Sequence, residues 1–463
     1  MKATKLTQWG SMMFLMTLLS LSSCKKPIEE ENFAPQKAFG GRKSTQGFVE
    51  NDMVMYWNEK TSMVLTGPGT PPSKSRYFAM IQIAVHDALN NIKPKFETFA
   101  LKNSREKNAN ADAAVASAAY WAIIGMGVQG SHPVEDWYNE SLASIPAGQS
   151  KDLGIALGKK SADAIIAKRL SDNLAIANQQ LPSPDGVAPG EYRSTLPFSN
   201  IGFPKIKALQ QWGTKMTPFV IESNSQFRPV APDALNSQEY LNDYNEVKTK
   251  GARVGHNRTA EEDEIGRFWA EISSFGWNRF ARNMIASKKL DSWKTARLFA
   301  LMHTAMVDDI TACFEAKYYY FYWRPETAIR MGDNDGNANT SGDVNWLPSY
   351  VEVPNGNNPL LNVYTPPVPE YPSAHASFGG AASEILKLFF NTDNISIHQT
   401  STSAQGITRH YATISQAAKD NSLSRIYIGF HFRNAVVKGE KMGQDVAHYV
   451  FNNSFRENGD ESN

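Results

Sequence analysis

Lys317 and Arg324 are two cationic side chains that stand seven residues apart in a strongly aromatic segment. Seven residues fall about 20° short of two full turns of an α-helix, so the spacing predicts that both cations project from one helical face and that Pro325 ends the helix. A solvated basic face is the ordinary explanation of such a pair. Here six aromatic residues lie between the two and would bury that face, and two buried cations need an anion. These residues are Tyr318, Tyr319, Tyr320, Phe321, Tyr322 and Trp323.

Ser373, Ala374 and His375 stand directly before a run of small residues that predicts a helix starting near Ala376. A serine hydroxyl and the free backbone N–H groups at a helix N-terminus bind anions. His375 is placed to exchange a proton with a group bound there. Taken alone, the segment is equally explained by a capping serine followed by a structural histidine.

Arg425 and His431 lie six residues apart in an apolar segment near the C-terminus. The planar fork of an arginine suits two oxygens of an oxyanion. A histidine can offer an unprotonated ring nitrogen as a nucleophile or a ligand. Either residue could belong to the core, but the three segments together predict one oxyanion site.

The order of these segments resembles the three-part signature shared by vanadium-dependent haloperoxidases and type 2 phosphatidic acid phosphatases. Residues 76–92, 211–235 and 290–318 are similar to the larger bacterial haloperoxidase branch, whereas the compact phosphatases lack this long N-terminal half. The resemblance rests on Lys317 with Arg324 and Pro325, on Pro372 to His375, and on Ser424 and Arg425 with His431. By this resemblance, the bound oxyanion is expected to be vanadate or phosphate.

The resemblance implies a haloperoxidase with a vanadate cofactor that oxidises halide with hydrogen peroxide. An acid phosphatase that cleaves a phosphate ester with the same residues is the alternative, and a non-catalytic oxyanion-binding surface lipoprotein is the third hypothesis. His431 would be the vanadium ligand or the phosphatase nucleophile, and His375 the acid or base. Lys317 would also polarise the bound peroxide. The oxyanion would be held by Lys317, Arg324, Ser373, the backbone N–H of Ala374, and Arg425.

Four positions depart from the family's pattern. Ala374 replaces the usual glycine of the middle motif, and Phe314 stands where a tryptophan is common. Val368 occupies a position at which chloride-oxidising and bromide-oxidising relatives carry different residues, Phe or His, so the sequence does not indicate which halide is used. Ala435 replaces a common aspartate, so the second ring nitrogen of His431 is expected to find another partner, Asn434 or a backbone carbonyl.

The bulk composition favours a large ordered domain and excludes several classes of function. The 463 residues are 41% hydrophobic, and 47 basic against 46 acidic side chains leave a net charge of +1. Such a balance recruits no nucleic acid. Helical periodicity with little strand alternation predicts an all-α fold with long Pro/Gly-rich loops. The resemblance implies that this fold is a large helical-bundle domain of haloperoxidase type. The chain could form a homo-oligomer.

The other histidines and Cys313 are interpreted as packing or surface residues. His86, His303 and His448 lie on apolar helical faces. His398 and His410 have no partners at metal-ligating spacing, so no zinc site is expected.

The N-terminus is typical of a bacterial lipoprotein signal. Lys2 and Lys5 precede a short apolar run that ends in Leu-Ser-Ser-Cys at residues 21–24. We therefore expect a signal peptide at 1–23 and lipidation of Cys24, although an uncleaved membrane anchor is the alternative. The protein would be exported to the cell envelope and would touch the membrane only through its lipid. The remaining predicted parts are a tether at 24–50, a helical domain at 51–455 with halves meeting near 260, and a polar tail at 456–463.

Overall fold

Capping side chains define where the long helices begin. Thr70 accepts a hydrogen bond from the backbone N–H of Ser73 at 3.4 Å, and Pro71 follows at the first helical position, where its missing N–H costs nothing. Asp291 accepts from the backbone N–H of Lys294 at 3.0 Å. These caps satisfy N–H groups that the first turn of a helix leaves without partners.

The computed structural model describes residues 52–67 and 69–459. The predicted signal peptide, the lipidation site Cys24 and the predicted tether lie outside the described residues. Residues 47–463 cluster as one compact unit. Within the described part of the chain, no helix combines the length and apolar composition of a membrane span. The predicted domain boundaries stay predictions.

The all-α prediction is confirmed, because helices dominate the described residues and the strands form only two short antiparallel pairs. The first part of the chain holds α1 (Met53–Val64), α2 (Pro71–Ile92), α3 (Ala111–Gly125), α4 (Val134–Ala143), α5 (Gln149–Lys168), α6 (Leu174–Ala177), β1 (Leu181–Pro182), β2 (Lys207–Ala208) and α7 (Trp212–Lys215). The second part holds α8 (Gln238–Lys250), α9 (Ala260–Phe268), α10 (Ser273–Lys288), α11 (Ser292–Tyr320), α12 (Pro325–Arg330), α13 (Ala374–Phe390), β3 (Asn394–Thr400), β4 (Thr408–Thr413), α14 (Ile414–Tyr427) and α15 (Arg433–Asn453), with short 3₁₀ turns at Gly332–Asn334 and Pro359–Leu361.

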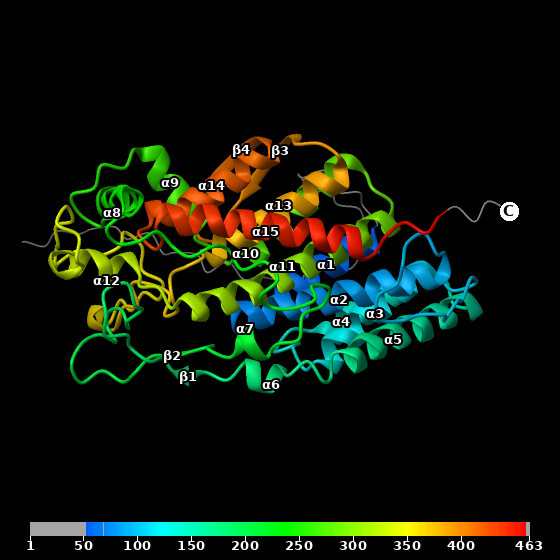
Figure 1. Ribbon diagram of the computed structural model, residues 1–463. Helices are drawn as coiled ribbons and strands as arrows, with labels where there is room; N and C mark the ends of the chain where they lie inside the picture. Colours follow the sequence, from blue (N-terminus) through cyan, green and yellow to red (C-terminus); the bar gives the residue numbers. More distant parts are fainter. Residues whose placement is uncertain (1–51, 68, 460–463) are drawn as a thin grey trace, which may run out of the picture. The chain divides into compact units, whose positions relative to one another are not determined.

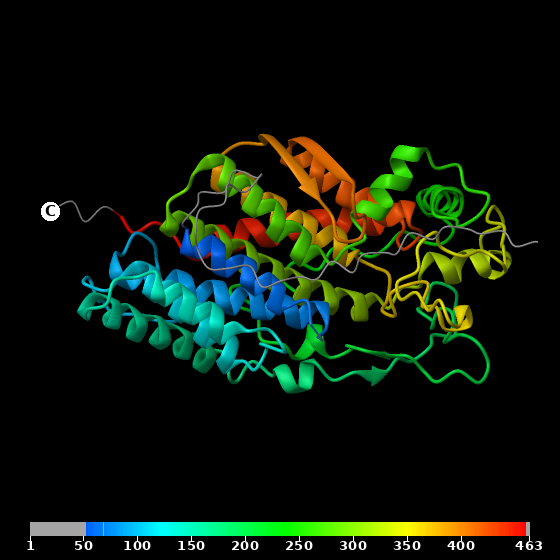
Figure 2. The same cartoon turned by 180° about the vertical axis from the view of Figure 1, so that it is seen from behind.

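Helix α11 is the central element of the bundle. Every residue from Thr295 to Phe314 is buried. Figure 1 shows α11 running between α2 on one side and α15 on the other, and α11 also contacts α13. Helices α3 and α5 pack against each other and onto α2, as the reverse view in Figure 2 also shows. The C-terminal end of α11 is therefore held by helices from both halves of the chain.

Helices α13 and α15 approach each other so closely that glycines are required at their contact. A methyl group on Gly443 of α15 would overlap the carbonyl oxygen of Ser377 on α13, and one on Gly380 would overlap the carbonyl oxygen of Glu440. The close approach also brings Gly439 against the backbone of Ser373, at the start of α13. This packing fixes the N-terminus of α13.

We expect Gly443→Ala to lower the free energy of unfolding by about 1–3 kcal/mol, because overpacking must push the two helices apart. A helical alanine placed without contacts would instead be neutral or favourable. Urea unfolding measures the difference, and Gly356→Ala is the control because no atom lies within 4 Å of the added carbon. A Gly443→Ala protein as stable as the unmodified chain would contradict this packing.

Candidate oxyanion-binding site

A cavity of about 310 Å³ lies where the end of α11, the start of α13 and the segment joining α14 to α15 meet. We call it the oxyanion cavity. Six of the seven site residues predicted from the sequence line it: Lys317, Arg324, Ala374, His375, Arg425 and His431. The seventh, Ser373, is fully buried beside it, where its hydroxyl accepts from the backbone N–H of Ala376 at 3.4 Å. The predicted segments therefore meet at one place, with Ser373 serving as the N-cap of α13.

Lys317 and Arg324 come together by a different route from the one predicted. Helix α11 ends at Tyr320 because Phe321 adopts a left-handed conformation with φ of 49°. Arg324 is then the N-cap of α12, and Pro325 begins that helix instead of ending the previous one. The prediction of one shared helical face is wrong, although both cations are 1% exposed and line the cavity.

Lys317 is held by two backbone carbonyls and by no carboxylate. Its Nζ donates to the carbonyl oxygens of Pro369 at 2.8 Å and Glu370 at 2.9 Å. Burial, which disfavours the charged form, and the nearby Arg324 together lower the pKa of Lys317 to about 7. A bound anion would reverse this effect.

His431 lies between an acceptor and a donor, and these neighbours determine its tautomer. Its Nδ1 is 2.9 Å from Oε1 of Glu370, and its Nε2 is 3.0 Å from Nη1 of Arg324. Since a guanidinium has no lone pair, Nε2 must accept and the ring proton must sit on Nδ1, which donates to Glu370. Burial holds the pKa of His431 well below its usual value, and Arg324 and Lys317 act in the same direction. His431 is thus neutral, with a lone pair on Nε2.

Glu370 is the partner that sequence reasoning missed. Neither Asn434 nor a backbone carbonyl supports the ring of His431, because the side chain of Asn434 donates to Asp233 at 2.7 Å instead. Oε1 of Glu370 also accepts from the backbone N–H of Phe432 at 2.9 Å. The carboxylate therefore comes from the segment before α13, which replaces the aspartate that the family usually carries at the position of Ala435.

Arg425 is a buried cation whose hydrogen-bonding groups are not all used. It is 5% exposed, and its Nε and Nη1 have no acceptor among the described residues. Burial lowers the pKa of Arg425 to about 10, which leaves it charged at neutral pH, while Glu352 acts to raise that pKa. Buried donors without acceptors are rare in native proteins. An oxyanion in the cavity would satisfy them.

His375 lines the same cavity. Its Nδ1 is 2.9 Å from Oγ of Ser273, the first residue of α10, while its buried Nε2 has no hydrogen-bond partner in the described part of the chain. Burial lowers the pKa of His375 well below its usual value, and the positive charge of Arg425 adds to this. The ring is neutral and can take up a proton.

The walls above these polar groups are largely apolar. Two positions that depart from the family's pattern lie here: Phe314 lines the cavity, and so does Val368, whose carbonyl oxygen accepts from Nε of Arg324 at 2.9 Å. The N-terminal half of the chain contributes Thr70 to Pro72 and the strand β2 to the mouth. Other apolar wall residues are Leu209, Ile272, Ile310 and Phe378.

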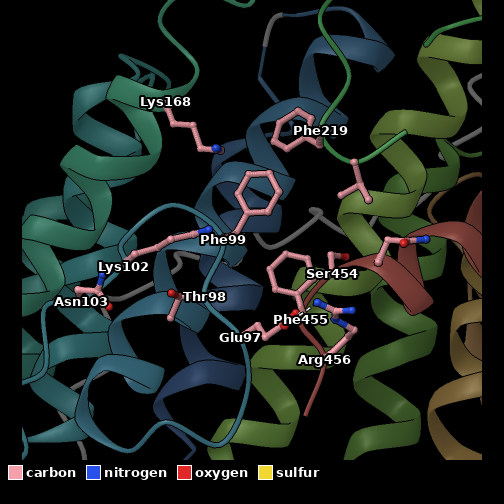
Figure 3. A pocket seen from close by; sticks show the side chains of 12 residues that line it. Glu97, Thr98, Phe99, Lys102, Asn103, Lys168, Phe219, Ser454, Phe455 and Arg456 are labelled. Atoms are coloured by element: carbon pink, nitrogen blue, oxygen red, sulfur yellow. Dashed lines mark hydrogen bonds and ion pairs between the residues drawn. The ribbon is translucent and has the colours of Figure 1, made fainter. Parts of the chain in front are cut away.

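A larger cavity of about 550 Å³ lies elsewhere and contains none of the predicted site residues. Figure 3 shows Phe99, Phe219 and Phe455 along it, with Lys102 and Lys168 at its edge. Its remaining charges include the paired Arg456 and Glu97, 2.8 Å apart. These residues provide no histidine and no buried cation without a partner, so the chemistry belongs to the smaller oxyanion cavity.

The affinity of the oxyanion cavity should depend on pH through Lys317. A bound oxyanion raises the pKa of this lysine above its free value of about 7, so binding above pH 7 takes up a proton and weakens about tenfold per pH unit. Lys317→Arg stays charged at every accessible pH. We therefore expect the ratio of the two proteins' affinities for orthovanadate to change about tenfold per unit between pH 7 and 9.

Equilibrium dialysis at several pH values measures this ratio. The ionisation of free orthovanadate changes both affinities by the same factor, so it does not affect their ratio. The ratio also cancels the titration of Glu370, whose pKa burial raises to about 8. A ratio independent of pH would mean that Lys317 stays protonated in the free protein.

Three buried cations and two neutral histidines therefore lie together where helices of one helical domain end or begin. Comparisons with known proteins agree. Residues 297–458 match the family model of the VCPO second helical-bundle domain. The chain is 24% identical over 500 aligned positions to the vanadium chloroperoxidase of Curvularia inaequalis. The alignment covers 82% of this chain and 78% of that protein.

Two solved structures share the fold. A bacterial vanadium-dependent iodoperoxidase superposes with a TM-score of 0.71 at 23% identity, covering 91% of this chain and all of that one. A bacterial vanadium-dependent chloroperoxidase in its apo form gives a TM-score of 0.62 at 16% identity, covering 83% and 95%. The family-model match, the curated relative and the shared fold together support the superfamily of vanadium-dependent haloperoxidases and type 2 phosphatidic acid phosphatases.

Proposed function

We propose that this protein is a vanadate-dependent haloperoxidase that oxidises halide with hydrogen peroxide in the oxyanion cavity. The proposal rests on the unsatisfied donors of Arg425, together with a histidine nitrogen at the same cavity that accepts only from Arg324 among the described residues. Arg425 keeps two buried N–H groups without acceptors, and His431 has a lone pair on Nε2. The chloroperoxidase and iodoperoxidase named above support halide oxidation over phosphate-ester hydrolysis.

The residues of the cavity fit vanadate. His431 would bond to vanadium through Nε2, with its ring held by Glu370. Lys317, Arg324 and Arg425 would neutralise the oxyanion, and the backbone N–H of Ala374 at the start of α13 would add a donor. Bound vanadate supplies a Lewis-acidic centre that makes peroxide electrophilic toward halide.

His375 is the residue proposed to move protons. In the tautomer whose Nδ1–H donates to Oγ of Ser273, Nε2 carries a lone pair that would accept the proton that hydrogen peroxide loses. Lys317, whose Nζ lies among backbone carbonyls at the cavity wall, would polarise the bound oxygens. The apolar walls would limit the water that competes for these groups.

Measuring halide oxidation by peroxide with and without orthovanadate tests the proposal. We expect activity with at least one of chloride, bromide and iodide, and we expect it only after vanadate is added to the stripped protein. Vanadate-inhibited hydrolysis of a phosphate ester without halide oxidation would make the protein an acid phosphatase. Tight vanadate binding without either reaction would make it a non-catalytic oxyanion-binding protein.

We further propose that the protein is lipid-anchored at the cell envelope, from the signal that ends at Cys24. Metabolic labelling with a fatty acid tests this. We expect label on the unmodified protein, recovery in the membrane fraction, and loss of both with Cys24→Ala. An unlabelled protein that stays in the membrane fraction would indicate an uncleaved anchor.

A further inference from the structure

The hairpin of β3 and β4 places two histidines directly opposite each other on its exposed face. His398 pairs with His410 in the antiparallel register. Both are exposed, whereas the flanking pair of Ile397 and Tyr411 is buried. Side chains alternate between the two faces of a sheet, so both imidazoles project to the solvent side. The sequence alone could not show that the two histidines are neighbours. They stand twelve positions apart, and only the register of the two strands places them opposite each other.

The separation of the two rings matches that of imidazoles sharing a metal ion. Their centroids are 5.0 Å apart, with 52° between the ring planes. With a metal–nitrogen bond of about 2.1 Å, each centroid lies about 3.2 Å from the metal, and angles of about 90–110° at the metal place the centroids about 4.5–5.2 Å apart. The observed distance falls inside this range without any movement of the strands.

The backbone that carries the two rings is held in place by the helices beneath it. The carbonyl oxygen of His398 accepts from Nδ2 of Asn283 on α10 at 3.0 Å. Nε2 of Gln399 donates to the carbonyl oxygen of Gly276, also on α10, at 3.1 Å. The hydroxyl of Tyr411 accepts from Nε1 of Trp269 at 2.9 Å. A ligand pair on such a support loses little conformational freedom when it binds a metal.

The ring nitrogens themselves remain accessible. No side chain of the described residues bonds the ring of His398, and His410 has only a 3.1 Å contact between Nε2 and Oγ of Ser396 on the same exposed face. Arg409, next to His410, points its charge elsewhere, into ion pairs with Glu261, Glu264 and Asp420. The guanidinium of Arg409 is therefore engaged by carboxylates and does not bond to the exposed imidazoles.

We propose that His398 and His410 form a binding site for one divalent transition-metal ion. The described residues hold no group of three or more metal-ligating side chains, so solvent would complete the coordination and the ion would exchange readily. Neutral imidazoles suit copper, nickel and zinc, with Cu²⁺ bound most tightly. Neither histidine lines the oxyanion cavity.

A metal on the hairpin would also stabilise one wall of that cavity. After β3 the chain reaches Thr402, whose backbone N–H and hydroxyl donate to Oε2 of Glu271 at 3.2 and 2.8 Å. Glu271 lines the mouth of the oxyanion cavity. Clamping β3 to β4 would therefore restrain the segment that positions Glu271.

Titration calorimetry of the full-length, tag-free protein with Cu²⁺, Ni²⁺ and Zn²⁺ tests the proposal. We expect one ion per chain, with Cu²⁺ tightest, and a melting temperature that rises with metal concentration. His398→Ala and His410→Ala should each weaken metal binding by about 100-fold. This is the lower end of the range of about 100- to 10,000-fold by which two linked contacts exceed one. The double variant should bind more weakly than either single variant, because each single variant keeps one imidazole.

His448→Ala is the matched control. This histidine is also exposed, but it belongs to α15, where its Nε2 lies 3.0 Å from Glu384. We expect its loss to leave the metal affinity unchanged. Absence of metal binding, or binding that survives both hairpin substitutions, would overturn the proposal. Neither result would bear on vanadate-dependent activity, which is measured separately.

Discussion

Replacing His431 with alanine is expected to remove vanadate-dependent halide oxidation and to weaken vanadate binding by more than about 100-fold. That value is the upper end of the loss usually caused by removing a residue that merely supports a metal ligand, and His431 is the proposed ligand itself. The substitution also leaves Glu370 and Arg324 each short of one hydrogen bond. We expect this to cost about 1–3 kcal/mol of stability while the fold is kept.

His303→Ala is the matched control for this prediction. His303, on α11, is also a buried histidine. Its ring stacks on Phe78 with 4.5 Å between ring centroids, and its Nε2 is hydrogen-bonded to Oδ1 of Asn278 at 2.8 Å. Its loss should lower stability comparably and leave vanadate affinity unchanged. If His431→Ala bound vanadate as tightly as the unmodified protein, the cations alone would hold the oxyanion and the assignment of His431 as ligand would be wrong.

Glu370→Gln should have an intermediate effect. The substitution keeps the size of the side chain but removes the carboxylate that accepts the Nδ1 proton of His431. We expect vanadate binding to weaken by about 10- to 100-fold. Dialysis against orthovanadate measures it alongside His431→Ala, and an unchanged affinity would show that Glu370 only fills space.

The sequence identified the polar groups of the cavity better than the backbone that carries them. Lys317 and Arg324 were predicted on one helix because seven residues nearly complete two turns. The left-handed conformation of Phe321 ends that helix first, and no local pattern announces it, since left-handed residues are usually glycine or asparagine. The two cations nevertheless converge, since both side chains are buried and line the same cavity.

The groups that support the two histidines were harder to predict. Glu370 reaches His431 across 61 positions of sequence, and Ser273 reaches His375 across 102. Each is one polar residue among many, and only tertiary packing selects it. A usable signal existed for Glu370 alone, which stands three residues before Ser373 in the middle motif. The helical class of the fold was predictable because apolar periodicity extends over many turns.

Arg425 shows why binding and stability should conflict in this cavity. The guanidinium is buried, its Nε and Nη1 lack acceptors in the described residues, and no carboxylate there lies within ion-pair distance. Removing such a charge from water is costly unless a partner compensates. In the free protein that cost is offset only in part, by the charge of Glu352 and by a 5.1 Å contact with the ring of Phe430. An oxyanion would provide the missing partner.

Arg425→Met should therefore stabilise the free protein, by about 1–4 kcal/mol, as replacing buried charges by apolar groups of similar size often does. It should also abolish the stabilisation by orthovanadate, which at a hundredfold excess over the dissociation constant is about 2.7 kcal/mol in the unmodified protein. Urea unfolding with and without orthovanadate measures both effects. Arg76→Met is the contrast: Arg76 is ion-paired with Asp172 at 2.6 Å, so its loss should destabilise the protein and leave the effect of vanadate intact. If Arg425→Met were less stable than the unmodified protein without ligand, the guanidinium would have an acceptor in the free state, and the cavity would not be poised for an anion.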